Sequence, residues 1–342
     1  MAEHFPHHPQ YVPIIKWQKW EQCALDHLDA DVVSWTLPCI EIRDSKQHGN
    51  LLAKLPAVWG RAALVDYADP NGRLTDQRRV ELREFLAHAT GAPAYLTPVI
   101  NPLDAVAMAD KALMKSIRTR QALAWRLRVP LNGDVASTVA ALAAVMPKLL
   151  QPDGGIRLIL DMGVTPAAWS DAQLAALGDG LKACADLGFT SIHLASGAFP
   201  DSLQTVVSKA TFVRRDWQLW QAANALVPEL HVGFGDYGTL SPLWTEEVLT
   251  RRGGRANIRY TLAKEWLVLR GGNITKDESV AISELMVTVH SASFEGPAFS
   301  FGDRLIAERA DPTVPMSQKH CGQYHIAEAW SHHVTFVTRK QY

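Results

Sequence analysis

The chain has 342 residues, of which 47% are apolar and 20% charged, a composition typical of a globular protein with a large core. Its formal net charge of -1 excludes a bulk basic field that would hold nucleic acid, although a local basic patch remains compatible with it. No uncharged run approaches the roughly 18 residues that a membrane span needs, and residues 1–10 lack the apolar stretch of a signal peptide. The four cysteines form no CxxC pair, so we expect free thiols in a cytoplasmic protein with no membrane partner.

Short apolar runs dominate the first two-thirds of the chain, after a polar, histidine-rich segment of residues 1–10 that we expect to be a disordered lead-in. Eight runs are separated by segments of helical length, and each is expected to form a strand. They span residues 11–16, 36–42, 62–67, 95–100, 123–129, 156–161, 191–196 and 230–236. The alternation predicts an α/β fold, a TIM-like (β/α)8 barrel over residues 11–250. The alternative is an open doubly wound parallel sheet, but no GxGxxG motif follows the first run.

The alternation of strands and helices stops after Asp236. Residues 258–262 and 266–270 are typical of two strands of a hairpin, and residues 277–293 are typical of a helix. The sequence pattern of residues 334–338 predicts a last strand. We therefore expect residues 251–342 to form a C-terminal α+β extension whose hairpin packs on the barrel mouth.

Carboxylates lie at the ends of four predicted strands. They are Glu41, Asp66, Asp161 and Asp236. The strand C-termini of such a barrel surround one mouth, so these side chains are expected to converge. Oxygen ligands of this kind suit Mg²⁺ or Mn²⁺, and a paired acid and base is an equal possibility. The structural interpretation is that they are helix caps or partners of Lys16, Arg126 or Arg128.

Two cations and two loops complete the predicted mouth. Lys16 and Arg128 also end strands, where they either neutralise a phosphate or balance the acids. The loops after strands seven and eight of such barrels often bind phosphate. Ser196 opens the first of these loops, and Tyr237 lies in the glycine-rich second one, although ordinary turn formation also explains both.

The C-terminal third holds further candidates for ligand binding. Arg259 and Arg270 belong to a group of arginines interleaved with Tyr260, a mixture that can hold a phosphodiester and stack a base. A solvated hairpin explains the same pattern more simply. The C-terminal histidines match no zinc-binding spacing, which leaves His333 as a candidate general base or ligand contact.

Several segments, in order along nearly the whole chain, resemble the phage-type beta protein family. Those near the N-terminus and in the barrel are Tyr11-Val12-Pro13-Ile14-Ile15-Lys16 with Glu21, Leu160-Asp161, Ser196-Gly197-Ala198-Phe199-Pro200, and Gly235-Asp236-Tyr237-Gly238. Those near the C-terminus are Ile258-Arg259-Tyr260, Trp266-Leu267-Val268, Phe299-Ser300-Phe301-Gly302-Asp303 and His332-His333. The resemblance implies a product of a phage, a phage satellite or a bacterial mobile element, with a role in host–phage conflict such as anti-phage defence. It implies no settled activity, cofactor or catalytic residue.

Two functions fit these observations. The first is a metal-dependent hydrolase, a phosphodiesterase or nuclease-like enzyme acting on a nucleotide or nucleic acid, with a divalent cation such as Mg²⁺ or Mn²⁺. Its catalytic residues would be Asp161, Asp236, Glu41 and Lys16. Its ligand-binding residues would be Asp66, Arg128, Ser196, Tyr237, Arg259, Tyr260, Arg270 and His333. The second is a non-enzymatic binding or sensor module that acts through a protein partner, encoded by a neighbouring defence or phage gene.

Overall fold

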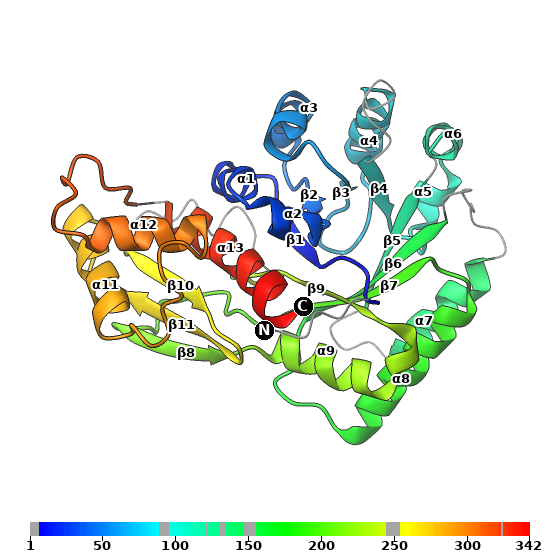
Figure 1. The fold of residues 1–342 in the computed structure, drawn as a ribbon. Helices are drawn as coiled ribbons and strands as arrows, with labels where there is room; N and C mark the ends of the chain where they lie inside the picture. The colour runs from blue at the N-terminus through cyan, green and yellow to red at the C-terminus, as the bar shows by residue number, and fades with distance from the viewer. Residues whose placement is uncertain are drawn as a thin grey trace.

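Eight parallel strands close into a barrel in the computed structural model of the protein, which describes residues 7–88, 96–120, 122–129, 135–146, 155–243, 254–322 and 324–342 (Figure 1). In order around the barrel they are β1 (Val12–Lys16), β2 (Cys39–Glu41), β3 (Ala63–Asp66), β4 (Leu96–Ile100), β5 (Leu123–Arg128), β6 (Ile156–Val164), β7 (Ser191–Gly197) and β9 (Gly233–Asp236). Val12 of β1 pairs with Gly235 of β9 and closes the ring. The predicted TIM-like barrel is confirmed, and the open doubly wound sheet is excluded.

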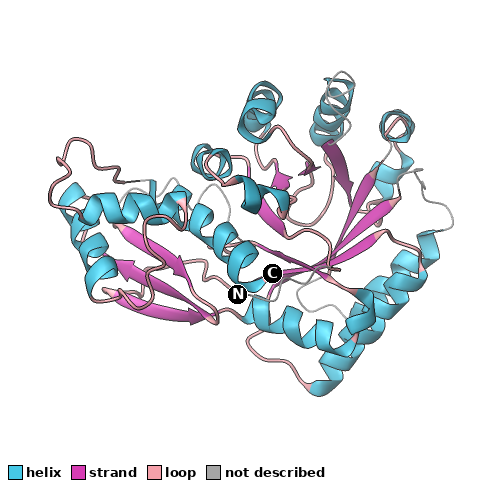
Figure 2. Cartoon of the chain, in the orientation of Figure 1, coloured by secondary structure: helices cyan, strands magenta, loops and turns pink. Residues whose placement is uncertain are grey.

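Helices follow the barrel strands and form its outer layer (Figure 2). They are α1 (Lys19–Asp26), α2 (Ala30–Ser34), α3 (Ser45–Trp59), α4 (Asp76–His88), α5 (Ala105–Ala109), α6 (Lys111–Arg118), α7 (Val135–Val145), α8 (Asp171–Asp186) and α9 (Arg215–Leu226), with a short 3₁₀ turn η2 (Pro228–Leu230). Capping boxes begin two of them. Asp44 and Gln47 cap α3, and Ser170 and Gln173 cap α8, which satisfies backbone N–H groups at both N-termini.

Strand side chains alternate between the inside of the barrel and the layer that faces the helices. Small and branched residues such as Ile14, Cys39, Leu64 and Ile159 pack together inside. Their neighbours along each strand, such as Ile15, pack outward with the helices in one large core. This alternation decides which of the strand-end side chains reach the mouth.

A small α+β unit lies beside the barrel (Figure 1, left). The hairpin strands β10 (Asn257–Thr261) and β11 (Glu265–Arg270) pair antiparallel, as predicted. A third strand, β8 (Lys209–Val213), comes from the connection between β7 and α9 and pairs with β11. Helices α11 (Lys276–Thr288) and α12 (Phe301–Ala310) complete the unit, and its apolar core includes Ile282, Met286 and Ile306.

The C-terminal segment returns to the barrel as a helix. Helix α13 (Tyr324–Phe336) packs against α1 and β10 and continues into a π-helical turn, η3 (Val337–Gln341). The predicted last strand at residues 334–338 is therefore wrong. Trp330, Val334 and Val337 recur at helical spacing and are buried in the barrel's outer core, and this packing overrides the strand preference of the local β-branched residues.

The described part of the N-terminal segment packs on the barrel. His8 Nδ1 lies 2.9 Å from the carbonyl oxygen of Val232, and the Tyr342 hydroxyl donates to the carbonyl of Pro9. Residues 1–6 of the expected lead-in lie outside the described residues, as do Arg251 and Arg252, which belong to the same group of arginines as Arg259 and Arg270. All four cysteines are free, and within the ranges given above no helix is long and apolar enough to cross a membrane.

Candidate functional site

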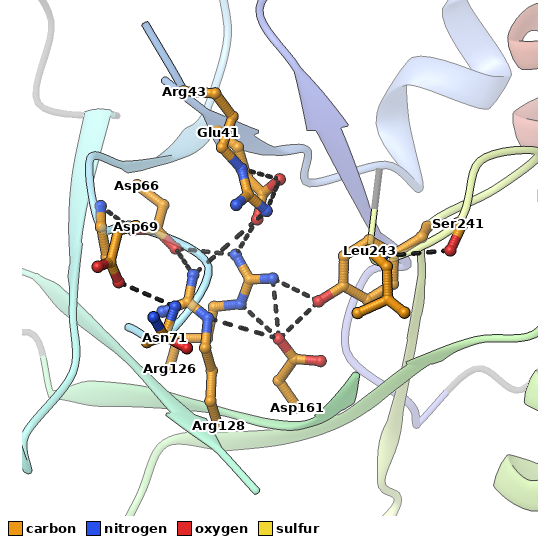
Figure 3. Close-up of polar contacts among 12 residues, drawn as sticks. Glu41, Arg43, Asp66, Asp69, Asn71, Arg126, Arg128, Asp161, Ser241 and Leu243 are labelled. Carbon is orange, nitrogen blue, oxygen red and sulfur yellow. Dashed lines mark hydrogen bonds and ion pairs between the residues drawn. The ribbon is translucent and has the colours of Figure 1, made fainter. Parts of the chain in front are cut away.

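Three strand-end carboxylates converge inside the barrel on one buried arginine, Arg126 of β5 (Figure 3). Its Nη1 donates to Glu41 Oε1 and to Asp66 Oδ2, each at 2.8 Å, and its Nε donates to Asp161 Oδ2 at 2.9 Å. Its Nη2 donates to the Tyr237 hydroxyl at 2.7 Å. We call Lys16, Glu41, Arg43, Asp66, Arg126, Arg128, Asp161 and Tyr237 the mouth cluster.

Every carboxylate oxygen of the mouth cluster already accepts a hydrogen bond. Arg43 donates to both oxygens of Glu41, at 2.8 to 3.1 Å. The remaining oxygens of Asp66 and Asp161 accept from the backbone N–H groups of Ala68 and Gly163, at 2.8 and 2.9 Å. Tyr237 adds a 2.7 Å bond to Asp161 Oδ2. The three acids thus belong to one continuous hydrogen-bond network.

Arg128 lies at the partly exposed side of this network, next to a turn that only glycine can form without strain. Its Nη2 donates to Asp66 Oδ2 at 3.0 Å, whereas its Nη1 is buried without a hydrogen-bond partner. Gly72 has a φ of +77°, and a Cβ there would lie 2.9 Å from that Nη1. The turn at Gly72 therefore packs closely against the guanidinium, whose Nη1 remains a donor without an acceptor.

The charges around the mouth shift several pKa values. Burial alone would raise the pKa of Glu41, but the guanidinium groups of Arg43 and Arg126 hold it well below its usual range. Burial lowers the pKa of Lys16 to about 8, partly opposed by Glu41. Burial raises the pKa of Glu21, in α1, to about 7, although Lys16 and Arg259 oppose the shift. Lys16 and Glu21 are thus two neighbouring groups that titrate near neutral pH.

The mouth cluster does not fit a divalent cation. Among the described residues, no group of three or more His, Cys, Asp or Glu side chains is placed to hold a metal ion. Glu41, Asp66 and Asp161 converge, but they converge on guanidinium groups that occupy the oxygens a metal would need.

Asp236 does not join the other three carboxylates, and the expectation that all four converge is wrong. On β9 it shares the outward side with Phe234, while Gly235 and Tyr237 belong to the inward one. Its Oδ2 lies 2.8 Å from His333 Nε2, and its Oδ1 accepts from the Tyr11 hydroxyl at 2.6 Å.

His333 connects Asp236 to the small unit. Its Nδ1 lies 2.9 Å from Thr261 Oγ1 on β10. The order hydroxyl, imidazole, carboxylate resembles a nucleophile with its base and orienting acid. All three residues are fully buried, so a substrate cannot reach the hydroxyl. Arg214 Nη2 also lies 4.0 Å from Asp236 Oδ2. We call Tyr11, Arg214, Asp236, Thr261 and His333 the junction cluster, since it joins the barrel, β10 and α13.

The family model described as Beta protein matches residues 11–339. The chain belongs to this family. A search of curated proteins finds no match. The Beta protein resemblance seen in the sequence is therefore confirmed across nearly the whole chain.

The remaining candidates make contacts that connect strands and loops of the fold. Ser196 pairs with Asp236 on the adjacent strand. Arg259 Nη1 donates to the Thr239 carbonyl at 2.9 Å, and its guanidinium lies over the ring of Phe199, so it joins β10 to the loops after β9 and β7.

Two more of these candidates are tied into the small unit. The Tyr260 hydroxyl donates to Asp303 Oδ1 at 2.6 Å. Arg270 Nη1 donates to the carbonyls of Leu203, Gln204 and Val206 and holds the loop that leads into β8.

Sequence reasoning gives too little weight to three residues of the site. It treats Arg126 only as a counter-ion, yet Arg126 forms the centre of the mouth cluster. The signal is present in the sequence, because Arg126 and Arg128 lie two apart in one strand and must face the same side. Arg43 and Glu21 lie outside the strand ends, and no strand pattern singles them out.

Proposed function

We propose that this Beta protein binds a phosphate-containing ligand, a nucleotide or a nucleic acid, at the barrel mouth, without a metal ion held by the carboxylates. The observation that carries the proposal is the pair Arg43 and Arg128, whose guanidinium groups lie at the partly exposed side of the mouth cluster, each side chain 11% exposed. Guanidinium groups at such a side can hold a phosphate oxygen with charge-assisted hydrogen bonds.

The charge balance of the mouth cluster favours an anion. The cations are Lys16, Arg43, Arg126 and Arg128, and the acids are Glu41, Asp66 and Asp161. Below the Lys16 pKa of about 8 these four cations outnumber the three acids, and Glu21, which interacts with Lys16, adds a negative charge only above its own pKa of about 7. Arg43 and Arg128 are the partly exposed members, so a ligand would meet guanidinium groups first.

Binding is better supported than hydrolysis. A general base needs a carboxylate oxygen free to take a proton, and those of the mouth cluster are already acceptors of arginine, tyrosine or backbone donors. Metal-dependent hydrolysis is less well supported for the same reason, because the carboxylate oxygens that would bind the metal ion already accept hydrogen bonds. The proposal therefore keeps Arg43, Arg128 and Lys16 as ligand contacts and assigns Arg126 to positioning the acids around them.

The biological setting of the proposal follows the family. A cytoplasmic product of a phage or mobile element that binds a nucleotide or nucleic-acid ligand would suit a role in host–phage conflict, including defence. The alternative is a module that acts only through a protein partner from a neighbouring gene, and it predicts no phosphate-dependent binding at the mouth.

Isothermal titration calorimetry tests the proposal, with inorganic phosphate, a nucleoside triphosphate and a short single-stranded oligonucleotide, each with and without Mg²⁺. We expect at least one probe to bind without Mg²⁺, and Arg128→Gln to weaken it by roughly tenfold or more, because a charge-assisted bond is lost. Arg304→Gln, at a half-exposed pair on α12, is the matched control and should bind as the wild type does. Binding unchanged by Arg128→Gln, or no binding of any probe, would contradict the proposal.

A further inference from the structure

Strand β8 is an open edge of the small sheet. The sheet has the order β10-β11-β8, and α13 packs against β10 at the opposite edge. Within the part of the chain that the structure describes, β8 pairs only with β11. Figure 2 draws it as the outermost strand of the unit, on the side away from α12. An exposed strand edge is a template for pairing with another strand.

The hydrogen-bond pattern identifies which backbone groups of β8 face outward. The Arg270 N–H donates to the Ser208 carbonyl at 2.8 Å, and the Arg214 N–H donates to the Lys264 carbonyl at 2.9 Å. In an antiparallel ladder, bonded and non-bonded residues alternate, so the even-numbered residues of this segment face β11. The N–H and C=O groups of Lys209, Thr211 and Val213 therefore point to the open edge.

We infer that two copies of this chain associate by antiparallel pairing of their β8 strands, and the register of β8 carries this inference. If Thr211 lies opposite Thr211 of the partner subunit, Lys209 lies opposite Val213 of the partner subunit. Every outward N–H and C=O then finds a partner, which gives about six backbone hydrogen bonds. The result is a two-fold interface in which one continuous sheet crosses the dimer.

Charge complementarity favours a second copy over an unrelated strand. Glu265 of β11 pairs in register with Val213, so it lies on the same face of the sheet one strand further in. In the dimer, Lys209 would approach Glu265 of the partner subunit across Val213 of the partner subunit. Two strand spacings separate them by roughly 10 Å, which the two long side chains can span. The two-fold symmetry makes this ion pair twice.

An exposed apolar surface beside β8 would be covered by the same association. Val213 is 45% exposed, and Val289, just after α11, is 69% exposed. Burial and then the charge of Lys209 lower the pKa of His290, which places the end of α11 beside β8. Apolar side chains next to an open strand edge are a usual feature of surfaces that associate.

The test is the oligomeric state of the full chain, measured by analytical ultracentrifugation across a micromolar concentration series. We expect a dimer for the wild type. Thr211→Pro removes an outward N–H, which an edge strand tolerates, and should raise the dimer dissociation constant by at least roughly tenfold. Thr211→Val keeps the backbone donor and should leave the dimer intact.

A charge exchange tests whether the strand that pairs with β8 belongs to a second copy of this chain, and it leaves the backbone unchanged. Lys209→Glu should weaken the dimer because it brings two acids together, and Lys209→Glu combined with Glu265→Lys should restore it. If circular dichroism shows that Thr211→Pro does not fold, these two Lys209 variants still test the β8-mediated dimer. A wild type that stays monomeric, with or without another bound protein, would overturn the inference, as would a Lys209→Glu dimer of unchanged affinity.

Discussion

Asp161 and Asp236 lie at the same rim of the barrel, yet their carboxylates lie on opposite faces of its wall. Asp161 Oδ2 accepts from Tyr237 and Arg126 inside the barrel, whereas Asp236 Oδ2 lies 2.8 Å from His333 outside it. The two acids share no hydrogen-bond partner among the described residues. The mouth cluster and the junction cluster are therefore separate networks, although Asp236 of one and Tyr237 of the other are adjacent in the sequence.

Separate networks predict additive effects on stability. The free energies of unfolding lost in Asp161→Asn and in Asp236→Asn should sum in the double variant to within about 0.5 kcal/mol. Asp161→Asn and Tyr237→Phe remove two ends of one hydrogen bond, so their double variant should deviate from the sum by about 0.5–3 kcal/mol. Urea denaturation of the single and double variants measures both cycles. Strong coupling between Asp161 and Asp236 would show that the barrel wall does not separate them.

The central guanidinium of the mouth cluster predicts a large loss of stability on its removal. Arg126→Met leaves Glu41, Asp66 and Asp161 buried without their shared counter-ion, and breaking a buried ion pair costs about 3–5 kcal/mol. Arg304→Met removes a half-exposed pair with Glu308 and should cost less than about 1 kcal/mol. Denaturant midpoints at neutral pH compare the two. An equal, small loss in both would mean that Arg126 does not hold the acids together.

Glu21 gives a prediction for pH. Its folded pKa of about 7 lies above its unfolded value of 4.5, so the folded state favours the protonated acid. Ionisation of the unfolded chain therefore lowers the stability of the fold as pH rises from about 4.5 to 7, after which the loss stays constant. Glu21→Gln cannot ionise and should be more stable than the wild type at pH 8, by up to about 3 kcal/mol.

The pH dependence of the difference isolates Glu21 from other titrating groups. The free energies of unfolding of Glu21→Gln and the wild type should converge as the pH falls toward 4.5. Chemical denaturation at a series of pH values measures this difference directly. A constant gap across the series would contradict a raised pKa. A variant less stable than the wild type at pH 8 would mean that Glu21 is held ionised by Lys16 and Arg259.

The barrel and the hairpin could be predicted from the sequence, because each strand is an apolar run of the right length between helical segments. Strand β8 was missed because its alternate residues Lys209, Thr211 and Val213 are exposed, and a short half-exposed strand carries little apolar signal. Its place in the sheet depends on β11, far along the chain.

The site was predictable in part. Once the barrel is assumed, the alternation of side chains along β2, β3 and β6 places Glu41, Asp66 and Asp161 on its inward side. The prediction that Asp236 joins the other acids was wrong because a shift of one residue along a strand moves a side chain to the opposite face. The glycines of β9 hide which side of that strand faces inward. That the acids meet arginines instead of a metal follows from three-dimensional contacts between β2, β3, β5 and β6, which no local pattern contains.

Two glycines in helices give opposite predictions for the same substitution. Gly302 lies at the crossing of α12 and α13, where a Cβ would lie 2.2 Å from the Glu328 carbonyl oxygen. Gly302→Ala must push these helices apart and should cost about 1–3 kcal/mol. Gly49 lies within α3, and no atom comes within 4 Å of the position that an alanine methyl group would take, so Gly49→Ala should stabilise the fold by about 0.5–1 kcal/mol. Thermal and urea unfolding of the two variants should shift in opposite directions, and a stable Gly302→Ala would mean that α13 does not pack on α12 as closely as described.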